Sequence, residues 1–162
     1  MSKKSAINLS CACILLWPLF FGCSAKTRQN TEVLSYEARS NGDTFLAEGK
    51  TIAAIQEYQK ACHFQPSSWQ SHYKLATAYE KLGKLDAAIA EYREIIKIHS
   101  WNSNPSYYAF SHFWLARALD KRGNRDEARK EYLIAYEIAS QDKKHNKKIR
   151  AIAEQSKHFV SQ

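Results

Sequence analysis

The sequence has few glycines and prolines, which interrupt helices, and few cysteines, which cross-link small folds. Its 162 residues include only 5 Gly and 3 Pro, which leaves little room for phosphate-binding loops or for a turn-rich β fold. Four cysteines are too few for a disulfide scaffold, and a 44% hydrophobic content is too high for a disordered chain. The length suits one ordinary domain and excludes two sizeable ones.

The chain also lacks the motifs that usually carry catalysis, namely a glycine-rich phosphate loop, an HExxH helix or a CxxC pair. His72 and His112 lie at equivalent places in an internal repeat, but no carboxylate or cysteine at helical spacing completes a ligand set. Packing is therefore favoured over metal binding for both histidines. Cys62 lies in an apolar pattern typical of a buried core thiol. We predict no enzyme activity, no metal and no cofactor.

The first 22 residues are typical of an export signal. Lys3 and Lys4 precede an apolar stretch that ends at Gly22, and a basic start, a short apolar body and a small final residue define such signals. The apolar body is shorter than a membrane span and is interrupted by Pro18. An export signal over residues 1–22 is the resulting prediction.

The segment Leu19-Phe20-Phe21-Gly22-Cys23 resembles a bacterial lipobox, although Phe20 departs from the aliphatic residue usual at its position. The resemblance implies lipidation of Cys23 and a membrane-anchored lipoprotein of the bacterial cell envelope, on the periplasmic side of the outer membrane in a Gram-negative cell. Two alternatives remain open. Cleavage after Ala25 would give a soluble periplasmic or secreted protein, and an uncleaved segment from Ala6 to Cys23 would act as an anchor.

The remaining chain repeats itself. Gly49-Lys50 and Gly83-Lys84 are 34 residues apart, and a third copy follows after 40 residues, with its extra residues in the turn-forming stretch 101–106. Within each copy apolar residues recur at i, i+3 and i+4, which predicts two amphipathic helices. We expect Gly83 to end a helix in a left-handed conformation and Asn104-Pro105 to start the fifth helix.

These copies are similar to the tetratricopeptide repeat (TPR) family over residues 35–140. The residues that carry the similarity are small and aromatic: Gly42, Phe45, Ala54, Tyr58, Ala61, Pro66, Leu75, Ala76, Tyr79, Gly83, Ala88, Tyr92, Leu115, Ala116, Gly123, Ala128, Tyr132 and Ala135. Ala38, His72 and His112 depart from the tryptophan frequent at their position. The resemblance implies an all-α, short right-handed solenoid of three helix-turn-helix repeats.

The predicted organisation follows from these boundaries. A linker, 23–34, leads from Cys23 to the repeats, which span 35–68, 69–102 and 103–140, and the last is preceded by a short insertion. Residues 141–162 are expected to form a basic capping helix, because a stack of helix pairs leaves its last apolar face open.

The TPR resemblance implies a concave groove lined by the first helix of each repeat. The inward-facing residues are expected to be Tyr36, Arg39, Asp43, Tyr73, Thr77, Glu80, Phe110, Phe113 and Arg117, with Asp120 at the rim. Arg39 and Asp43 stand where chaperone-binding members clamp a terminal carboxylate with Lys and Asn, so that ligand is not expected. The aromatic and arginine content predicts a non-catalytic adaptor that binds a peptide segment of a protein partner. The layout resembles that of repeat lipoproteins that assist pilus, secretion or outer-membrane assembly, which implies a place within a secretion, pilus or envelope-assembly complex.

The formal net charge of +8 is concentrated near the C-terminus. Five of the six basic residues of 141–162 lie close together in the sequence: Lys143, Lys144, Lys147, Lys148 and Arg150. Nucleic acid is not an expected partner of an exported protein. The alternative to an adaptor is a spacer whose basic helix docks on anionic lipid or cell-wall polymer. A solvated capping helix explains the same charges without any ligand.

Overall fold

The computed structural model describes residues 17–99 and 105–141, together with 151, 154, 155 and 159. Side chains are described from residue 29 onward. The described chain contains helices and no strand. The helices are α1 (Trp17–Ala47), α2 (Thr51–Phe64), α3 (Trp69–Lys81), α4 (Leu85–Ile98), α5 (Pro105–Arg122) and α6 (Arg125–Ser140).

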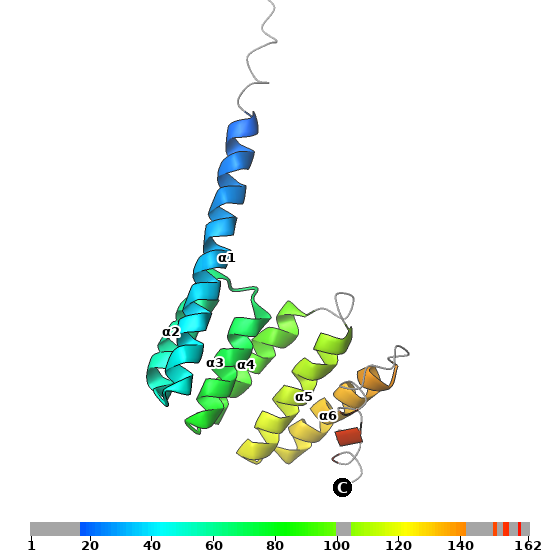
Figure 1. Ribbon diagram of the computed structural model, residues 1–162. Helices are drawn as coiled ribbons and strands as arrows, with labels where there is room; N and C mark the ends of the chain where they lie inside the picture. The colour runs from blue at the N-terminus through cyan, green and yellow to red at the C-terminus, as the bar shows by residue number, and fades with distance from the viewer. Residues whose placement is uncertain (1–16, 100–104, 142–150, 152–153, 156–158, 160–162) are drawn as a thin grey trace, which may run out of the picture.

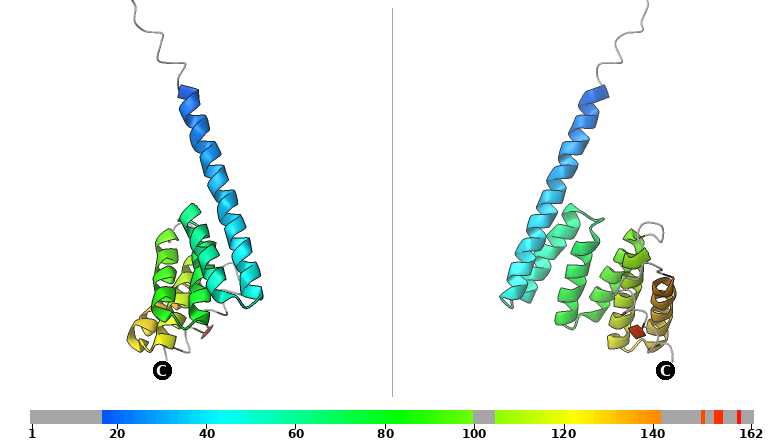
Figure 2. Two further views of the ribbon diagram at one scale, coloured as in Figure 1. Left: turned by 90° about the vertical axis from the view of Figure 1, so that its left-hand side faces the viewer. Right: turned by 45° about the vertical axis from the view of Figure 1, so that its right-hand side comes forward.

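These helices form three antiparallel pairs, α1/α2, α3/α4 and α5/α6, which stack in chain order (Figure 1). The second helix of each pair also contacts the first helix of the next, as α2 contacts α3 and α4 contacts α5. Two views from other directions show the same stacking (Figure 2). The all-α helical-repeat solenoid predicted from the sequence is confirmed.

Helix α1 is much longer than its partner α2 and projects beyond the repeats (Figure 1). Its first part includes residues 23–34, which the sequence predicted to be a linker; their backbone is helical and continuous with the first repeat. The physical reason is that no Gly or Pro occurs between residues 23 and 41 to interrupt the helix. Among the described residues, no helix has both the length and the apolar character needed to cross a membrane.

The turns within the pairs are built on glycine, as predicted. Gly49, Gly83 and Gly123 have φ values of 77°, 70° and 94°, in the left-handed region that costs glycine little. Each glycine is followed by a residue whose backbone N–H returns to a carbonyl five positions earlier; Lys84, for example, donates to Tyr79 at 3.0 Å. The expected start of α5 at Pro105 is also observed.

One tyrosine is buried between the two helices of each pair. Tyr58, Tyr92 and Tyr132 are 0%, 2% and 2% exposed. The hydroxyl of Tyr58 donates to Asp43 at 2.7 Å, and that of Tyr92 donates to Glu80 at 2.7 Å. Burial, reinforced by the neighbouring carboxylate, raises the pKa of both tyrosines well above the ordinary value. The hydroxyls therefore remain protonated donors that join the second helix to the first.

Small residues make room for these rings. Gly42 is buried opposite Tyr58, and a Cβ atom added to Gly42 would lie 2.5 Å from Cε1 of the tyrosine ring. In the second and third pairs the equivalent residues are Ala76 and Ala116, both fully buried. The first pair thus packs more tightly at this position than the other two.

We predict that Gly42→Ala destabilises the protein by about 1–3 kcal/mol, because the new methyl group overlaps a ring that the surrounding core holds in place. The exposed neighbour Ser40 provides the control, and Ser40→Ala should change stability by less than about 0.5 kcal/mol. Urea unfolding followed by circular dichroism measures both. Equal stability of the two variants would contradict the packing described for Tyr58.

Candidate functional site

The first helices of the three pairs, α1, α3 and α5, present a common surface, which we call the A-face. Two ion pairs join these helices: Lys74 Nζ lies 2.8 Å from Asp43 Oδ1, and Lys121 contacts Glu80. Burial acts to raise the pKa of Asp43, but hydrogen bonds from Lys74 and Tyr58 outweigh it and lower that pKa below its ordinary value. Both predicted acidic groove residues are therefore already neutralised by a lysine of the following repeat.

Tyr36 and Arg39 lie on the A-face within α1. Tyr36 is 66% exposed, and the Arg39 guanidinium carbon lies 5.5 Å from the centre of its ring. Arg39 also reaches Ser68 Oγ at 3.4 Å, but within the described residues it has no carboxylate partner. This end of the A-face thus offers an exposed aromatic ring and a cation that has no direct ion pair among the described residues, although its charge helps to lower the pKa of Asp43.

Two predicted aromatic groove residues meet at a tryptophan that the sequence analysis did not single out. The rings of Tyr73 and Trp114 lie 4.3 Å apart, and Phe110 stacks on Trp114 at 5.6 Å. All three side chains are half-buried, so their rings pack together at the junction between α3 and α5 and remain partly exposed to solvent. Thr77, also half-buried, donates its hydroxyl to the carbonyl of Lys74 at 2.9 Å.

The expected place of Phe113 in the groove is corrected by the structure. Phe113 is 8% exposed and packs edge-to-face on Tyr132 with ring centres 5.7 Å apart. Its bulk fills the space inside the third helix pair and leaves little ring surface for a partner. Phe113 is therefore a core residue.

Arg117 is the exposed cation of the A-face in α5. Among the described residues it has no carboxylate within ion-pair distance, yet it lies close enough to Tyr92 and Tyr132 for its charge to oppose the rise in their pKa values. Burial and the charge of Asp120 nevertheless raise the pKa of Tyr132 to about 12. Arg117 therefore lies beside the buried tyrosine hydroxyls of two repeats and keeps its charge available.

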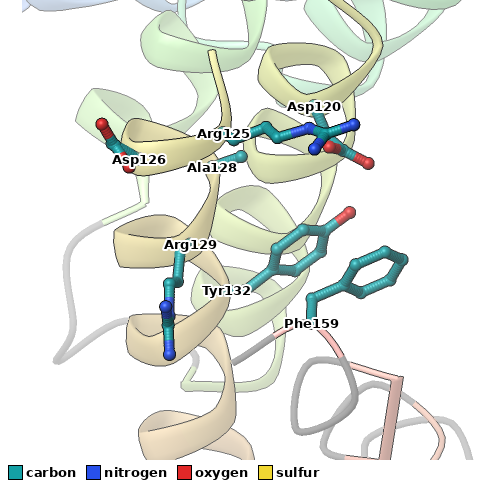
Figure 3. A pocket seen from close by; sticks show the side chains of 7 residues that line it. All are labelled: Asp120, Arg125, Asp126, Ala128, Arg129, Tyr132 and Phe159. Carbon is teal, nitrogen blue, oxygen red and sulfur yellow. The ribbon is translucent and has the colours of Figure 1, made fainter. Parts of the chain in front are cut away.

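A hollow of about 390 Å³ lies at the C-terminal end of the repeats. Figure 3 shows Asp120 and Arg125 on one side of it, with the Tyr132 hydroxyl pointing toward them. Phe159 stacks on Tyr132, with ring centres 4.4 Å apart and planes inclined by 7°. Part of the segment predicted as a cap thus covers the last buried tyrosine. Phe159 was not among the residues predicted from the sequence, because its contact is with Tyr132, a residue of the preceding repeat.

His72 and His112 each form a close pair with a glutamate of the second helix of their repeat. His72 Nδ1 lies 2.7 Å from Glu91 Oε2, and the equivalent His112 lies 2.6 Å from Glu131 Oε2. His72 Nε2 also donates to the carbonyl of Pro66 at 3.0 Å, whereas the buried His112 Nε2 has no hydrogen-bond partner within the described part of the chain. The two glutamates were not found from the sequence because each lies 19 residues downstream, on the second helix of the pair.

Cys62 packs against the core of the first repeat, but it is half-buried and also faces this histidine. Hydrogen bonding to Cys62 and Glu91 raises the pKa of His72 to about 10, against the opposing effect of burial. The sequence argument considered only ligands at helical spacing, and the structure brings a cysteine and a carboxylate from other helices beside His72.

Several predicted residues have no described side chain. The backbone of Cys23 and Ala25 lies within α1, but their side chains fall outside the described part of the structure. The basic residues Lys143, Lys144, Lys147, Lys148 and Arg150 also lie outside it.

The contrast between Phe113 and Tyr36 gives a direct prediction. Phe113→Ala should lower the free energy of unfolding by about 3–5 kcal/mol, because it removes a buried ring. Tyr36→Ala removes an exposed ring and should change it by less than about 0.5 kcal/mol. Chemical denaturation measures both values. If the Phe113→Ala variant were as stable as Tyr36→Ala, the burial of Phe113 in the core would be contradicted.

Comparison with known proteins supports the repeat assignment. Family models described as TPR repeat and tetratricopeptide repeat match residues 42–83 and 70–99. The co-chaperone DNJ1 of Cryptococcus neoformans, a tetratricopeptide repeat and J domain-containing protein, is 36% identical over 59 residues, which cover 36% of this chain and 11% of DNJ1. Superkiller complex protein 3 of Mus musculus is 36% identical over 59 residues, 36% of this chain and 4% of its own length. The chain thus matches only a small part of these relatives.

Solved structures share the fold at low sequence identity. The first TPR domain of Spaghetti (RPAP3), bound to the HSP90 peptide SRMEEVD, superposes with a TM-score of 0.60 at 18% identity, covering 81% of this chain and 96% of that one. The type III secretion translocator chaperone SycD of Yersinia enterocolitica gives a TM-score of 0.62 at 16% identity, with 78% and 87% covered. TPR2B of yeast Sti1, in complex with pHsp70, gives 0.61 at 16% identity, with 78% and 98% covered. Residues 42–99 therefore carry tetratricopeptide repeats, and the chain has the fold of a tetratricopeptide-repeat domain.

Proposed function

We propose that this protein is a non-catalytic adaptor that binds an acidic peptide segment of a protein partner on its A-face. The observation that carries the proposal is Arg117, an exposed arginine with no ion pair among the described residues, beside the buried tyrosines of two repeats. A guanidinium on a partly enclosed surface favours a carboxylate ligand, because it can donate two parallel hydrogen bonds.

The other side chains of the A-face fit the same ligand. Arg39 provides a second cation, with no direct ion pair to a carboxylate in the described part of the chain, and Tyr36 and Phe110 provide rings against which apolar side chains can pack. The acidic residues Asp43 and Glu80 are held by lysines, so they repel an acidic segment less than free carboxylates would. Two of the fold relatives described above are complexes, one with the HSP90 peptide and one with pHsp70.

The binding proposal is tested by charge reversal. Arg117→Glu should weaken binding of the partner segment by about 10–100-fold, since a charge-assisted hydrogen bond contributes about 1.5–3 kcal/mol. Lys130→Glu makes the same charge change at an exposed residue of α6, outside the A-face, and should leave the affinity within about twofold.

The partner segment for this test comes from a photo-crosslinking residue placed at Tyr36 in the full chain, with position 130 as the matched control. Titration calorimetry then compares the recovered segment with a version in which each Asp and Glu is replaced by its amide. Equal affinities of the two segments, or equal losses from Arg117→Glu and Lys130→Glu, would rule out acidic recognition on the A-face.

We further propose that Cys23 carries a lipid and that the protein is an envelope lipoprotein acting in a secretion, pilus or envelope assembly. The supporting observation is that α1 continues past the repeats toward Cys23 (Figure 1). Between Cys23 and Ser35 a helix rises about 18 Å at about 1.5 Å per residue, so this stretch would hold the A-face away from a membrane surface. The likeness in fold to a secretion chaperone agrees with this setting.

The anchor is tested by intact mass and membrane partitioning of protein from the expressing cell. The protein with Cys23 should carry a lipid-sized mass and sediment with membranes, and Cys23→Ser should lose both properties. Cys62→Ser is the matched control and should keep both. Release of a soluble chain that begins at Lys26 would show cleavage after Ala25 and would overturn the proposed anchor.

A further inference from the structure

Cys62, His72 and Glu91 form a cluster that the proposed adaptor function does not use. They come from three successive helices, α2, α3 and α4, and meet where the first repeat packs on the second. Their ligand atoms, one from each residue, all lie within 4.8 Å of one another. All three side chains are half-buried, so the cluster is sheltered and still open to an ion from solvent.

We propose that Cys62, His72 and Glu91 bind a divalent transition-metal ion of the zinc type. Thiolate, imidazole and carboxylate are the ligands that Zn²⁺ takes in proteins, and three protein ligands leave a fourth position for water. Around a tetrahedral ion with bonds of about 2.0–2.3 Å, ligand atoms lie roughly 3.3–3.7 Å apart. The cluster therefore needs only about an ångström of side-chain movement to close on an ion.

The orientation of His72 supports this assignment. Its Nδ1 faces Glu91 Oε2 at 2.7 Å, and its Nε2 donates to the carbonyl of Pro66 at 3.0 Å. A metal-bound histidine usually donates its other ring N–H to a carbonyl or carboxylate, which fixes the plane of the ring. Here the carbonyl of Pro66 already fixes the ring, so that an ion can replace the proton between Nδ1 and Oε2.

The next repeat provides an internal comparison. His112 and Glu131 form the same pair at 2.6 Å, and among the described residues His112 Nε2 has no hydrogen-bond partner. The residue one 34-residue period after Cys62 is Ile96, which has no ligand atom. The thiol ligand is thus specific to the junction of the first two repeats. Only that junction is expected to bind metal.

The test uses the full chain without an affinity tag and with Cys11, Cys13 and Cys23 changed to Ser, so that Cys62 is its single thiol. Titration with Co²⁺ should give one equivalent of a tetrahedral complex with a thiolate-to-cobalt charge-transfer band, which Zn²⁺ then displaces. Additional Cys62→Ser should abolish the band. His72→Gln and Glu91→Gln should each weaken Co²⁺ binding roughly tenfold or more.

His112→Gln is the matched control, because it breaks the equivalent pair in the third repeat and should leave the Co²⁺ affinity unchanged. Circular dichroism melting curves show whether each variant is folded, and Zn²⁺ should raise the melting temperature of the parent and of His112→Gln, but not of Cys62→Ser. The proposal is overturned if the single-thiol protein gives no charge-transfer band, or if His112→Gln weakens binding as much as His72→Gln does.

Discussion

The tyrosine buried between the two helices of each repeat is the contact on which the rest of the structure depends. Tyr58 lies directly against Gly42, and its hydroxyl donates to Asp43 at 2.7 Å. Tyr92 repeats this arrangement with Glu80. The ring fits only where a small residue lies opposite it. The buried hydroxyl needs a hydrogen-bond acceptor, because an unpaired buried polar group lowers the stability of the fold. The small residue recurs in all three repeats and the carboxylate acceptor in the first two, so the repeat period of the sequence reflects this contact.

This contact also shapes the surface that the first helices present. The carboxylates that accept from Tyr58 and Tyr92 reach the A-face, where lysines of the following repeats pair with them. The negative charges of Asp43 and Glu80 are thus paired with lysines of the solenoid itself. Arg39 and Arg117 have no ion pair of this kind to a carboxylate among the described residues, and on this ground we propose that the A-face takes acidic ligands.

The repeat fold could be predicted because its determinants are local and periodic: small residues, glycine turns and aromatic spacing are all visible in the sequence. The length of α1 was missed, since a linker was assumed where nothing interrupts the helix. Contacts between helices that are distant in sequence could not be predicted either. Phe113 belongs to the core because Tyr132 lies beside it, and Cys62, His72 and Glu91 meet although they lie on three different helices.

The central claim is that the A-face is the binding surface, and resonance mapping by NMR tests it most directly. On titration with the crosslinked partner segment, we expect the largest shifts at Tyr36, Thr77 and Arg117, with little change in α2, α4 and α6. Shifts concentrated on those second helices, with the A-face unperturbed, would contradict the account.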